Sequence, residues 1–158
     1  MNIRRAVTAD IDGISKLLQQ VNNVHADGRP DIFIRDKRKY TADQLCELLA
    51  DDTRPIFVAV DDEGAVMGYC FCIFEEPATD NMQPIRTLYI DDLCVDSELR
   101  GRHIGTELYR FTRDYAAKNG FYHITLNVWN LNTSAMRFYE SCGLTPLKVT
   151  MEDILPRD

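Results

Sequence analysis

Residues 93–106, LCVDSELRGRHIGT, contain residue types that could bind a phosphate group. An apolar strand pattern runs into a basic, glycine-containing turn, and a helical pattern follows. The first N–H groups of a helix have no partner within the helix, and the helix dipole adds positive potential there. The main chain of this turn could therefore bind a pyrophosphate, with the Arg100 guanidinium as a further donor.

Two neighbouring carboxylates, Asp91 and Asp92, lie just before this turn inside the apolar run 88–95. Strand alternation predicts that their side chains lie on opposite faces, so that only one points at a given site. Acids inside an apolar strand are costly unless they are paired or functional. Two roles stay open: a base or substrate anchor, and a structural ion pair.

Composition limits the class of protein and its compartment. The chain has 158 residues, 45% of them hydrophobic and 27% charged, which is ordinary for one globular domain over residues 1–158. A net charge of -7 disfavours nucleic acid as a partner. Residues 1–8 lack the apolar core of a secretory signal, and no apolar run has the length of a membrane span. We expect a cytoplasmic protein without a membrane partner.

The cysteines favour neither disulfides nor a metal site. There are five, an odd number scattered through strand and helix patterns. Cys70 and Cys72 could share one face of a strand, but no second Cys or His pair has zinc spacing. We expect buried thiols and no bound metal.

Hydrophobic periodicity predicts strands that alternate with helices. Expected strands cover residues 2–6, 56–60, 65–74, 86–95, 123–129 and 144–154, and a tight turn at 61–64 joins the second and third into a hairpin. Expected helices cover residues 11–21, 41–49, 104–118 and 133–142, with structured loops at 25–39 and 75–84. This order predicts an α/β (α+β) sheet of mixed direction. It lacks the consecutive parallel βαβ units of a doubly wound nucleotide-binding fold.

Two segments resemble the signatures of the GNAT superfamily of N-acetyltransferases. Arg100–Gly105 is similar to the acetyl-CoA signature Arg/Gln-x-x-Gly-x-Gly/Ala, with His103 at the usual middle glycine. Asn127–Leu144 is similar to the second signature, Asn-x-x-Ala-x-x-Phe-Tyr-x-x-x-Gly-Phe, with Leu144 in place of the final Phe. One strand separates the two helices, as in the family, and Ile3–Ala6 with Asp10 resembles the family's opening strand and helix. The resemblance covers nearly the whole chain.

The resemblance implies a fold and a cosubstrate. The expected fold is a mixed, mostly antiparallel sheet of six to seven strands, with helices on both faces and a central splayed strand pair. Acetyl-CoA is the implied cosubstrate, with its pyrophosphate on the glycine turn and its pantetheine arm along the preceding strand and near Asn132. A helix-capping role for Asn132 can coexist with this contact. The implied cofactor-binding residues are Leu93, Cys94, Val95, Arg100, Gly101, Arg102, His103, Ile104, Gly105, Thr106 and Asn132.

The resemblance also implies a reaction, in which the acetyl group passes to a primary amine by direct attack in a ternary complex. The acceptor could be a small amine or polyamine, an aminoglycoside-like compound, or a protein N-terminus or lysine. Tyr139 matches the family's general acid, and Asp91 and Asp92 resemble the acidic pair of amine acetyltransferases. The family builds its acceptor site from the loops that correspond to 25–33 and 75–84. The candidate acceptor-binding residues are therefore His25, Asp27, Asp31, Phe33 and Glu75.

Two further alternatives stay open. Many relatives are dimers, so a homodimer is compatible with the resemblance. If the His103 imidazole fills the phosphate turn, a non-catalytic acyl-CoA-binding sensor becomes the better interpretation.

Overall fold

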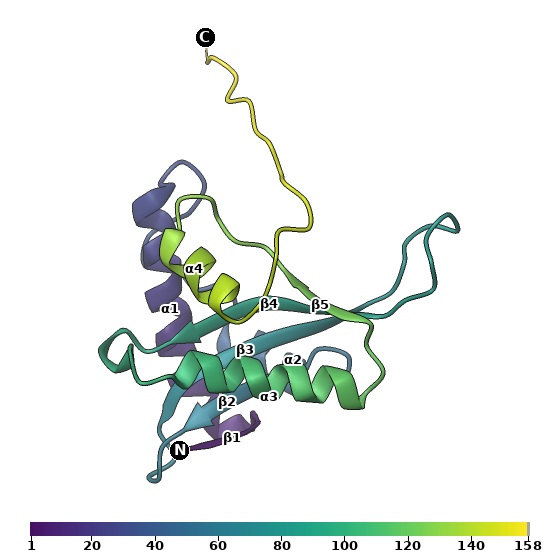
Figure 1. The fold of residues 1–158 in the computed structure, drawn as a ribbon. Helices are drawn as coiled ribbons and strands as arrows, with labels where there is room; N and C mark the ends of the chain where they lie inside the picture. Colours follow the sequence, from purple (N-terminus) through teal and green to yellow (C-terminus); the bar gives the residue numbers. More distant parts are fainter. Residues whose placement is uncertain (158) are drawn as a thin grey trace. The chain divides into compact units, whose positions relative to one another are not determined.

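A five-stranded sheet organises the computed structural model, which describes residues 1–157 (Figure 1). The strands are β1 (Asn2–Arg5), β2 (Ile56–Val60), β3 (Val66–Glu75), β4 (Thr87–Val95) and β5 (His123–Leu126). They lie in the order β1-β2-β3-β4-β5; the first three pairs are antiparallel, and β4 and β5 are parallel. The mixed, mostly antiparallel fold is confirmed, with five strands among the described residues instead of six to seven.

The chain divides into two compact units, Met1–Asn127 and Val128–Asp158. The first unit contains the whole sheet together with α1 (Ile11–Gly28), α2 (Ala42–Leu49) and α3 (Ile104–Lys118). The second contains α4 (Thr133–Ser141). That residues 1–158 act as a single domain stays a prediction.

One face of the sheet is covered by α1 and α2 (Figure 1). Apolar residues at helical spacing on α1 pack on alternate residues of β2 and β3, as amphipathic patterning requires. Thr41 caps α2, because its hydroxyl accepts from the Gln44 N–H and the Gln44 side chain accepts from the Thr41 N–H. The core on this face consists of Ile11, Ile14, Leu17, Leu18, Leu45, Leu48, Ile56, Val58, Val60, Tyr69, Phe71 and Cys94, with Ala6.

The opposite face is covered by α3 (Figure 1). Phe57 on β2 meets the rings of Phe111 and Tyr115 of α3 edge-on, at centroid distances of 5.1 and 5.0 Å. A Cβ at Gly68 of β3 would lie 2.8 Å from the Cys94 carbonyl oxygen of β4 and 3.0 Å from Leu108 Cδ1 of α3, so glycine lets both elements approach β3. Within the first unit, helices therefore lie on both faces, as expected.

Strands β4 and β5 separate before β4 ends. Their parallel pairing runs from Thr87 and His123 to Ile90 and Leu126, whereas β4 continues to Val95. Within residues 1–157, the stretch 91–95 of β4 thus has no β5 partner, although it remains paired with β3 from Asp92 on. This is the predicted splay, and it leaves this side of β4 without a strand partner beyond Ile90 within residues 1–157.

Two sequence predictions are wrong at the level of elements. No strand forms in residues 144–157, although Leu147, Val149 and Met151 alternate as in a strand. Alternation predicts an apolar face, but it does not predict a neighbouring strand for the main chain to bind, and a β-strand needs both. Helix α1 continues to Gly28, so the predicted loop begins at Arg29, because the helix has no breaker before Pro30.

Candidate active site

The turn between β4 and α3 is anchored by the buried carboxylate of Asp96. Its oxygens accept from Lys16 Nζ at 3.1 Å, from Gln20 Nε2 at 3.4 Å and from the Glu98 N–H at 3.1 Å. The Asp96 N–H donates to the Met67 carbonyl at 2.9 Å. Burial works against the charged form, but these donors lower the pKa of Asp96. The start of the turn is thereby fixed to α1 and β3.

The turn itself uses two left-handed residues. Gly101 has φ 79° and His103 has φ 60°, ψ 12°. His103 is the N-cap of α3, and its carbonyl accepts from the Glu107 N–H at 3.0 Å. A left-handed backbone is the conformation that favours glycine, and His103 adopts it at the position where the resembled signature has its middle glycine.

The side chains of this turn leave its main chain open. Arg100, Gly101, Arg102 and His103 are exposed, and a Cβ at Gly101 would meet nothing within 4 Å. The first N–H groups of α3, from Ile104 to Thr106, have no carbonyl one helical turn earlier to bind. Arginines and free N–H groups at the start of a fifteen-residue helix fit a pyrophosphate. His103 keeps the shape of the turn, and its imidazole does not become buried in it.

A β-bulge on β4 brings Asp91 and Asp92 together. Phe71 of β3 pairs with Asp92 while the next residue, Cys72, pairs with Ile90, so Asp91 is the extra residue. Asp91 accepts from the Tyr40 hydroxyl at 2.8 Å, and Asp92 accepts from the Tyr69 hydroxyl at 2.7 Å.

The two phenols belong to one aromatic cluster on the face that α1 and α2 cover. Tyr40 stacks on Phe71 at 5.5 Å and Tyr69 meets Phe71 edge-on at 4.9 Å. Both carboxylates therefore meet the same cluster. The expectation that they lie on opposite faces is wrong, because the bulge interrupts strand alternation between them.

The two carboxylates differ in charge balance. Asp91 also accepts from Lys39 Nζ at 2.7 Å, and its side chain is 12% exposed. Asp92 has no cation in direct contact among the described residues, and burial raises its pKa from 3.8 to about 6. The Tyr69 hydrogen bond and the more distant Lys39 charge act in the opposite direction. Asp91 is thus an ion-paired carboxylate, and Asp92 can exchange a proton near neutral pH.

Burial next to these acids also keeps neighbouring groups protonated. Desolvation and the Asp92 charge raise the pKa of the Cys94 thiol to about 12. Desolvation and the neighbouring carboxylates raise the pKa of Tyr40 and of Tyr69. The phenols are therefore hydrogen-bond donors to the carboxylates at physiological pH, and Cys94 is a thiol and not a thiolate.

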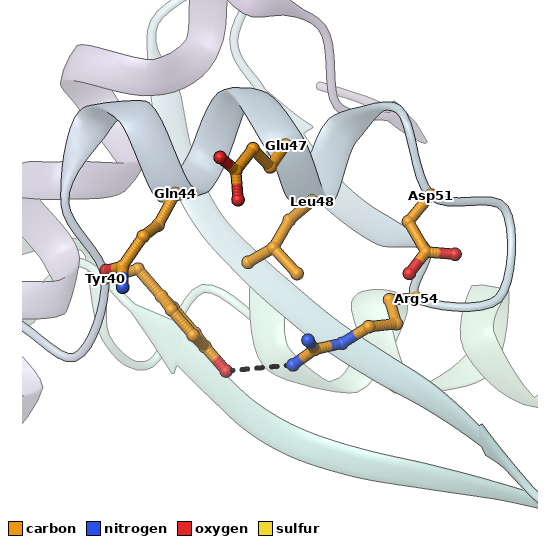
Figure 2. Close-up of a pocket in the computed structure, with 6 residues that line it drawn as sticks. All are labelled: Tyr40, Gln44, Glu47, Leu48, Asp51 and Arg54. Carbon is orange, nitrogen blue, oxygen red and sulfur yellow. Dashed lines mark hydrogen bonds between the residues drawn. The ribbon is translucent and has the colours of Figure 1, made fainter.

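A cleft of about 270 Å³ adjoins the Tyr40 side of this cluster (Figure 2). Arg54 lies across it from Tyr40, and its Nη2 donates to the Tyr40 hydroxyl at 3.4 Å. The Tyr40 hydroxyl therefore joins Arg54 to Asp91. The cleft is lined by Tyr40, Gln44, Glu47, Leu48, Asp51 and Arg54.

The predicted acceptor-binding residues divide into two groups. Asp31 forms a two-pronged salt bridge with Arg29 at 2.8 and 2.9 Å, and Asp27 pairs with Arg35. These two acids are thus neutralised by neighbours. His25, which α1 carries on its last turn, stacks on Phe33 at 5.0 Å.

His25 interacts electrostatically with Lys39, and Glu75 with Tyr89. Burial and the Lys39 charge lower the pKa of His25. Glu75, the last residue of β3, contributes with burial and Asp91 to raising the pKa of Tyr89 on β4. His25 is thus close enough to Lys39, and Glu75 to Tyr89, for their charges to matter, and the acceptor-site role of both residues stays a prediction.

In the second unit, Asn132 and Tyr139 lie at the two ends of α4. Asn132 is the N-cap, and its Oδ1 accepts from the Ala135 N–H at 3.1 Å. Tyr139 meets Phe138 edge-on at a centroid distance of 5.0 Å. The capping role of Asn132 is confirmed; its contact with pantetheine and the acid role of Tyr139 stay predictions.

Sequence reasoning missed Lys39, Tyr40 and Tyr69. Tyr69 is separated from Asp92 by 23 residues, and Lys39 and Tyr40 are separated from Asp91 by 52 and 51. No local spacing reports such pairs. The one available signal is that Lys39 and Tyr40 immediately precede the Thr41 cap of α2, which fixes their position.

The described residues hold neither a metal-ligand cluster nor a membrane-spanning helix. The Sγ atoms of Cys70 and Cys72 lie 3.8 Å apart in the core, and the part of the chain that the structure describes holds no group of three potential metal ligands. In that same part, no helix combines the length and apolar character needed to cross a membrane.

Comparisons with known proteins find similar folds and similar sequences. A single-residue mutant of the BH1408 protein from Bacillus halodurans has a crystal structure with a TM-score of 0.93, at 30% identity over 99% of this chain and 100% of that one. A probable N-acetyltransferase 14 from Xenopus tropicalis is 31% identical over 57% of this chain. A glucosamine 6-phosphate N-acetyltransferase from Arabidopsis thaliana is 30% identical over 40% of this chain. The matched segments span 40% of the length of each of these two curated relatives.

The family comparison covers most of the chain. The sequence profile described as the acetyltransferase (GNAT) family matches residues 18–144, which include the bulge, the glycine turn and α4. The chain belongs to the acetyltransferase (GNAT) family.

Proposed function

We propose that the chain is an N-acetyltransferase that transfers the acetyl group of acetyl-CoA to a primary amine by direct attack in a ternary complex. The observation that carries the proposal is Asp92, which accepts from the Tyr69 hydroxyl, contacts no cation within residues 1–157 and has its pKa raised by burial to about 6, a value that suits proton exchange at neutral pH. It lies on β4, the strand that leads into the phosphate-binding turn.

Acetyl-CoA supplies an activated acetyl thioester, and residues of the chain hold it. The open turn from Arg100 to Thr106 supports pyrophosphate binding through main-chain N–H groups and arginines. The free edge of β4 from Leu93 to Val95 supports pairing with the pantetheine amides, as a strand edge pairs with an extended peptide.

The amine acceptor arrives as an ammonium and must lose a proton before it can attack. Asp92 accepts that proton, and its hydrogen bond from Tyr69 fixes the carboxylate in place. Asp91 attracts the ammonium. Tyr139 gives a proton to the departing thiolate. A covalent relay through Cys94 is disfavoured, because its pKa of about 12 keeps the nucleophilic thiolate scarce.

The test of this function is an acceptor screen with free thiol release as the readout. The panel contains spermidine, glucosamine 6-phosphate, an aminoglycoside and a peptide with a free N-terminus, each with acetyl-CoA. We expect turnover on at least one amine. Saturable binding of acetyl-CoA without turnover on any amine would contradict the enzyme and support an acyl-CoA sensor.

Tyr139→Phe tests the acid within the same screen. Loss of the phenol proton should lower turnover at least about tenfold, with little effect on acetyl-CoA affinity. An unchanged turnover number would remove Tyr139 from the mechanism.

A further inference from the structure

The chain places one of its own primary amines at the acid pair. Lys39 Nζ lies 2.7 Å from Asp91 Oδ1, and the same carboxylate accepts from the Tyr40 hydroxyl. The Asp91 side chain is 12% exposed and the Lys39 side chain is 48% exposed. The Lys39 side chain is therefore partly in solvent, and its ammonium contacts a carboxylate that is mostly buried. An alkyl ammonium on Asp91 is the arrangement that an amine acceptor would make.

The local structure holds Lys39 in this position. Tyr40, the next residue, is fixed by its stack on Phe71 and by hydrogen bonds with Asp91 and Arg54. Thr41 then caps α2. The Lys39 charge is also close enough to Asp92 to affect its proton equilibrium. By contrast, Lys37, which lies two residues before Lys39, is exposed and forms no ion pair within residues 1–157.

We propose that Lys39 is an internal acceptor, acetylated in cis at Nζ by the chain's own acetyltransferase centre. The inference rests on the proposed function. Asp91 lies two residues before Leu93, the start of the free β4 edge, which is about 7 Å along an extended strand. Rotation about the side-chain bonds of Lys39 moves Nζ over that distance.

The reaction balances without another reactant. The Lys39 ammonium gives one proton to Asp92, and the neutral amine forms a bond from Nζ to the acetyl carbonyl carbon. The bond from that carbon to sulfur breaks, and Tyr139 gives its proton to the departing thiolate, so that CoA leaves as the free thiol. The second proton of the amine replaces the one that Tyr139 has given, and Asp92 releases its proton to solvent. Acetylation removes the Lys39 charge and so frees the Asp91 carboxylate for an external ammonium.

The test incubates the full chain with deuterated acetyl-CoA in the absence of an acceptor and follows acetylation of each lysine by peptide mass spectrometry. Lys37 is the matched control for chemical acetylation. We expect Lys39 to react at least tenfold faster than Lys37, with a first-order rate that does not change on dilution of the protein. Equal rates at the two lysines, or a rate that falls on dilution, would overturn the proposal.

Two variants distinguish acetylation of Lys39 from the proposed acetyltransferase activity on external amines. Asp92→Asn should slow labelling of Lys39 at least tenfold and leave Lys37 unchanged; equal labelling of Lys39 in both proteins would mean chemical acetylation only. Lys39→Gln, which has the uncharged head group of acetyl-lysine, should lower KM for the amine used in the acceptor screen. Thiol release with an external amine, but no labelling of Lys39, would overturn the internal acceptor and leave the enzyme standing.

Discussion

Two carboxylates of the first unit, Asp10 and Asp92, are shielded from solvent with opposite effects on their charge. Asp10, at the start of α1, accepts from both terminal nitrogens of Arg4 at 2.7 and 3.0 Å and from the Val7 N–H at 2.8 Å. Burial opposes its charge, but these donors lower its pKa. Asp92 accepts from the neutral Tyr69 hydroxyl, and burial raises its pKa to about 6.

The comparison shows what distinguishes a structural acid from a reactive one. Both are largely removed from solvent, so burial alone does not decide the role. A bidentate guanidinium lowers the pKa of Asp10 and so favours its charged form. A phenol donor leaves Asp92 able to take up and release a proton.

Asp92→Asn should give the largest effect on activity. The amide keeps the size of the side chain and can still accept from Tyr69, but it cannot take a proton from an ammonium. We expect the turnover number to fall about a hundredfold or more, and the rise of activity through about pH 6 to disappear. Steady-state kinetics between pH 5 and 9 on the best amine of the screen measure both. A variant that keeps the wild-type pH profile would assign the base to another group.

Asp10→Asn should have the opposite effect to Asp92→Asn: it should lower stability and leave turnover unchanged. Removal of one partner leaves the Arg4 guanidinium without its carboxylate, at a cost of about 2 kcal/mol in the free energy of unfolding. Urea unfolding at pH 7 measures the loss, and turnover below the midpoint should be unchanged. A fall in turnover at unchanged stability would contradict the structural role of Asp10.

The two acids should also give opposite pH dependences of stability. Asp92 binds its proton more tightly when folded, so its charging lowers the free energy of unfolding as pH rises from about 4 to about 6. Asp10 binds its proton less tightly when folded, so its contribution is lost as pH falls below its usual range. Unfolding of Asp92→Asn should therefore lack the decline between pH 4 and 6. A decline of equal size in variant and wild type would contradict a raised pKa of Asp92.

Tyr69→Phe should change the pKa of Asp92 by removing one hydrogen bond. The Tyr69 hydroxyl favours the charged form of Asp92, so its removal raises the pKa of that carboxyl. The midpoint of the activity profile should move up by about one pH unit, the size expected for a hydrogen bond to a charged group. Tyr40→Phe is the matched control, because its hydroxyl binds Asp91 instead. Equal shifts in both variants would mean that the pair titrates as one unit.

The sequence predicts the elements better than the site. The helix over residues 104–118 and the strand that leads into the glycine turn follow from local periodicity, and both are confirmed. The bulge at Asp91 depends on register with β3, which no local pattern contains. For the same reason the phenol partners, Tyr40 and Tyr69, could not be predicted. Asp27 and Asp31 looked available for an amine, but Arg35 and Arg29 pair with them.

Lys39→Met should lower stability less than Asp10→Asn does. Lys39 pairs with Asp91 as Arg4 pairs with Asp10, but by a single contact and from a side chain that is 48% exposed. Solvent screens such a pair, and Asp91 keeps the Tyr40 hydroxyl when the ammonium is lost. The free energy of unfolding should therefore fall by less than about 1 kcal/mol, and salt should reduce the difference. Urea unfolding at low and high ionic strength measures it. A loss as large as that of Asp10→Asn would make Lys39 a structural partner of Asp91, whereas a small loss leaves Lys39 an ammonium that another ammonium can replace.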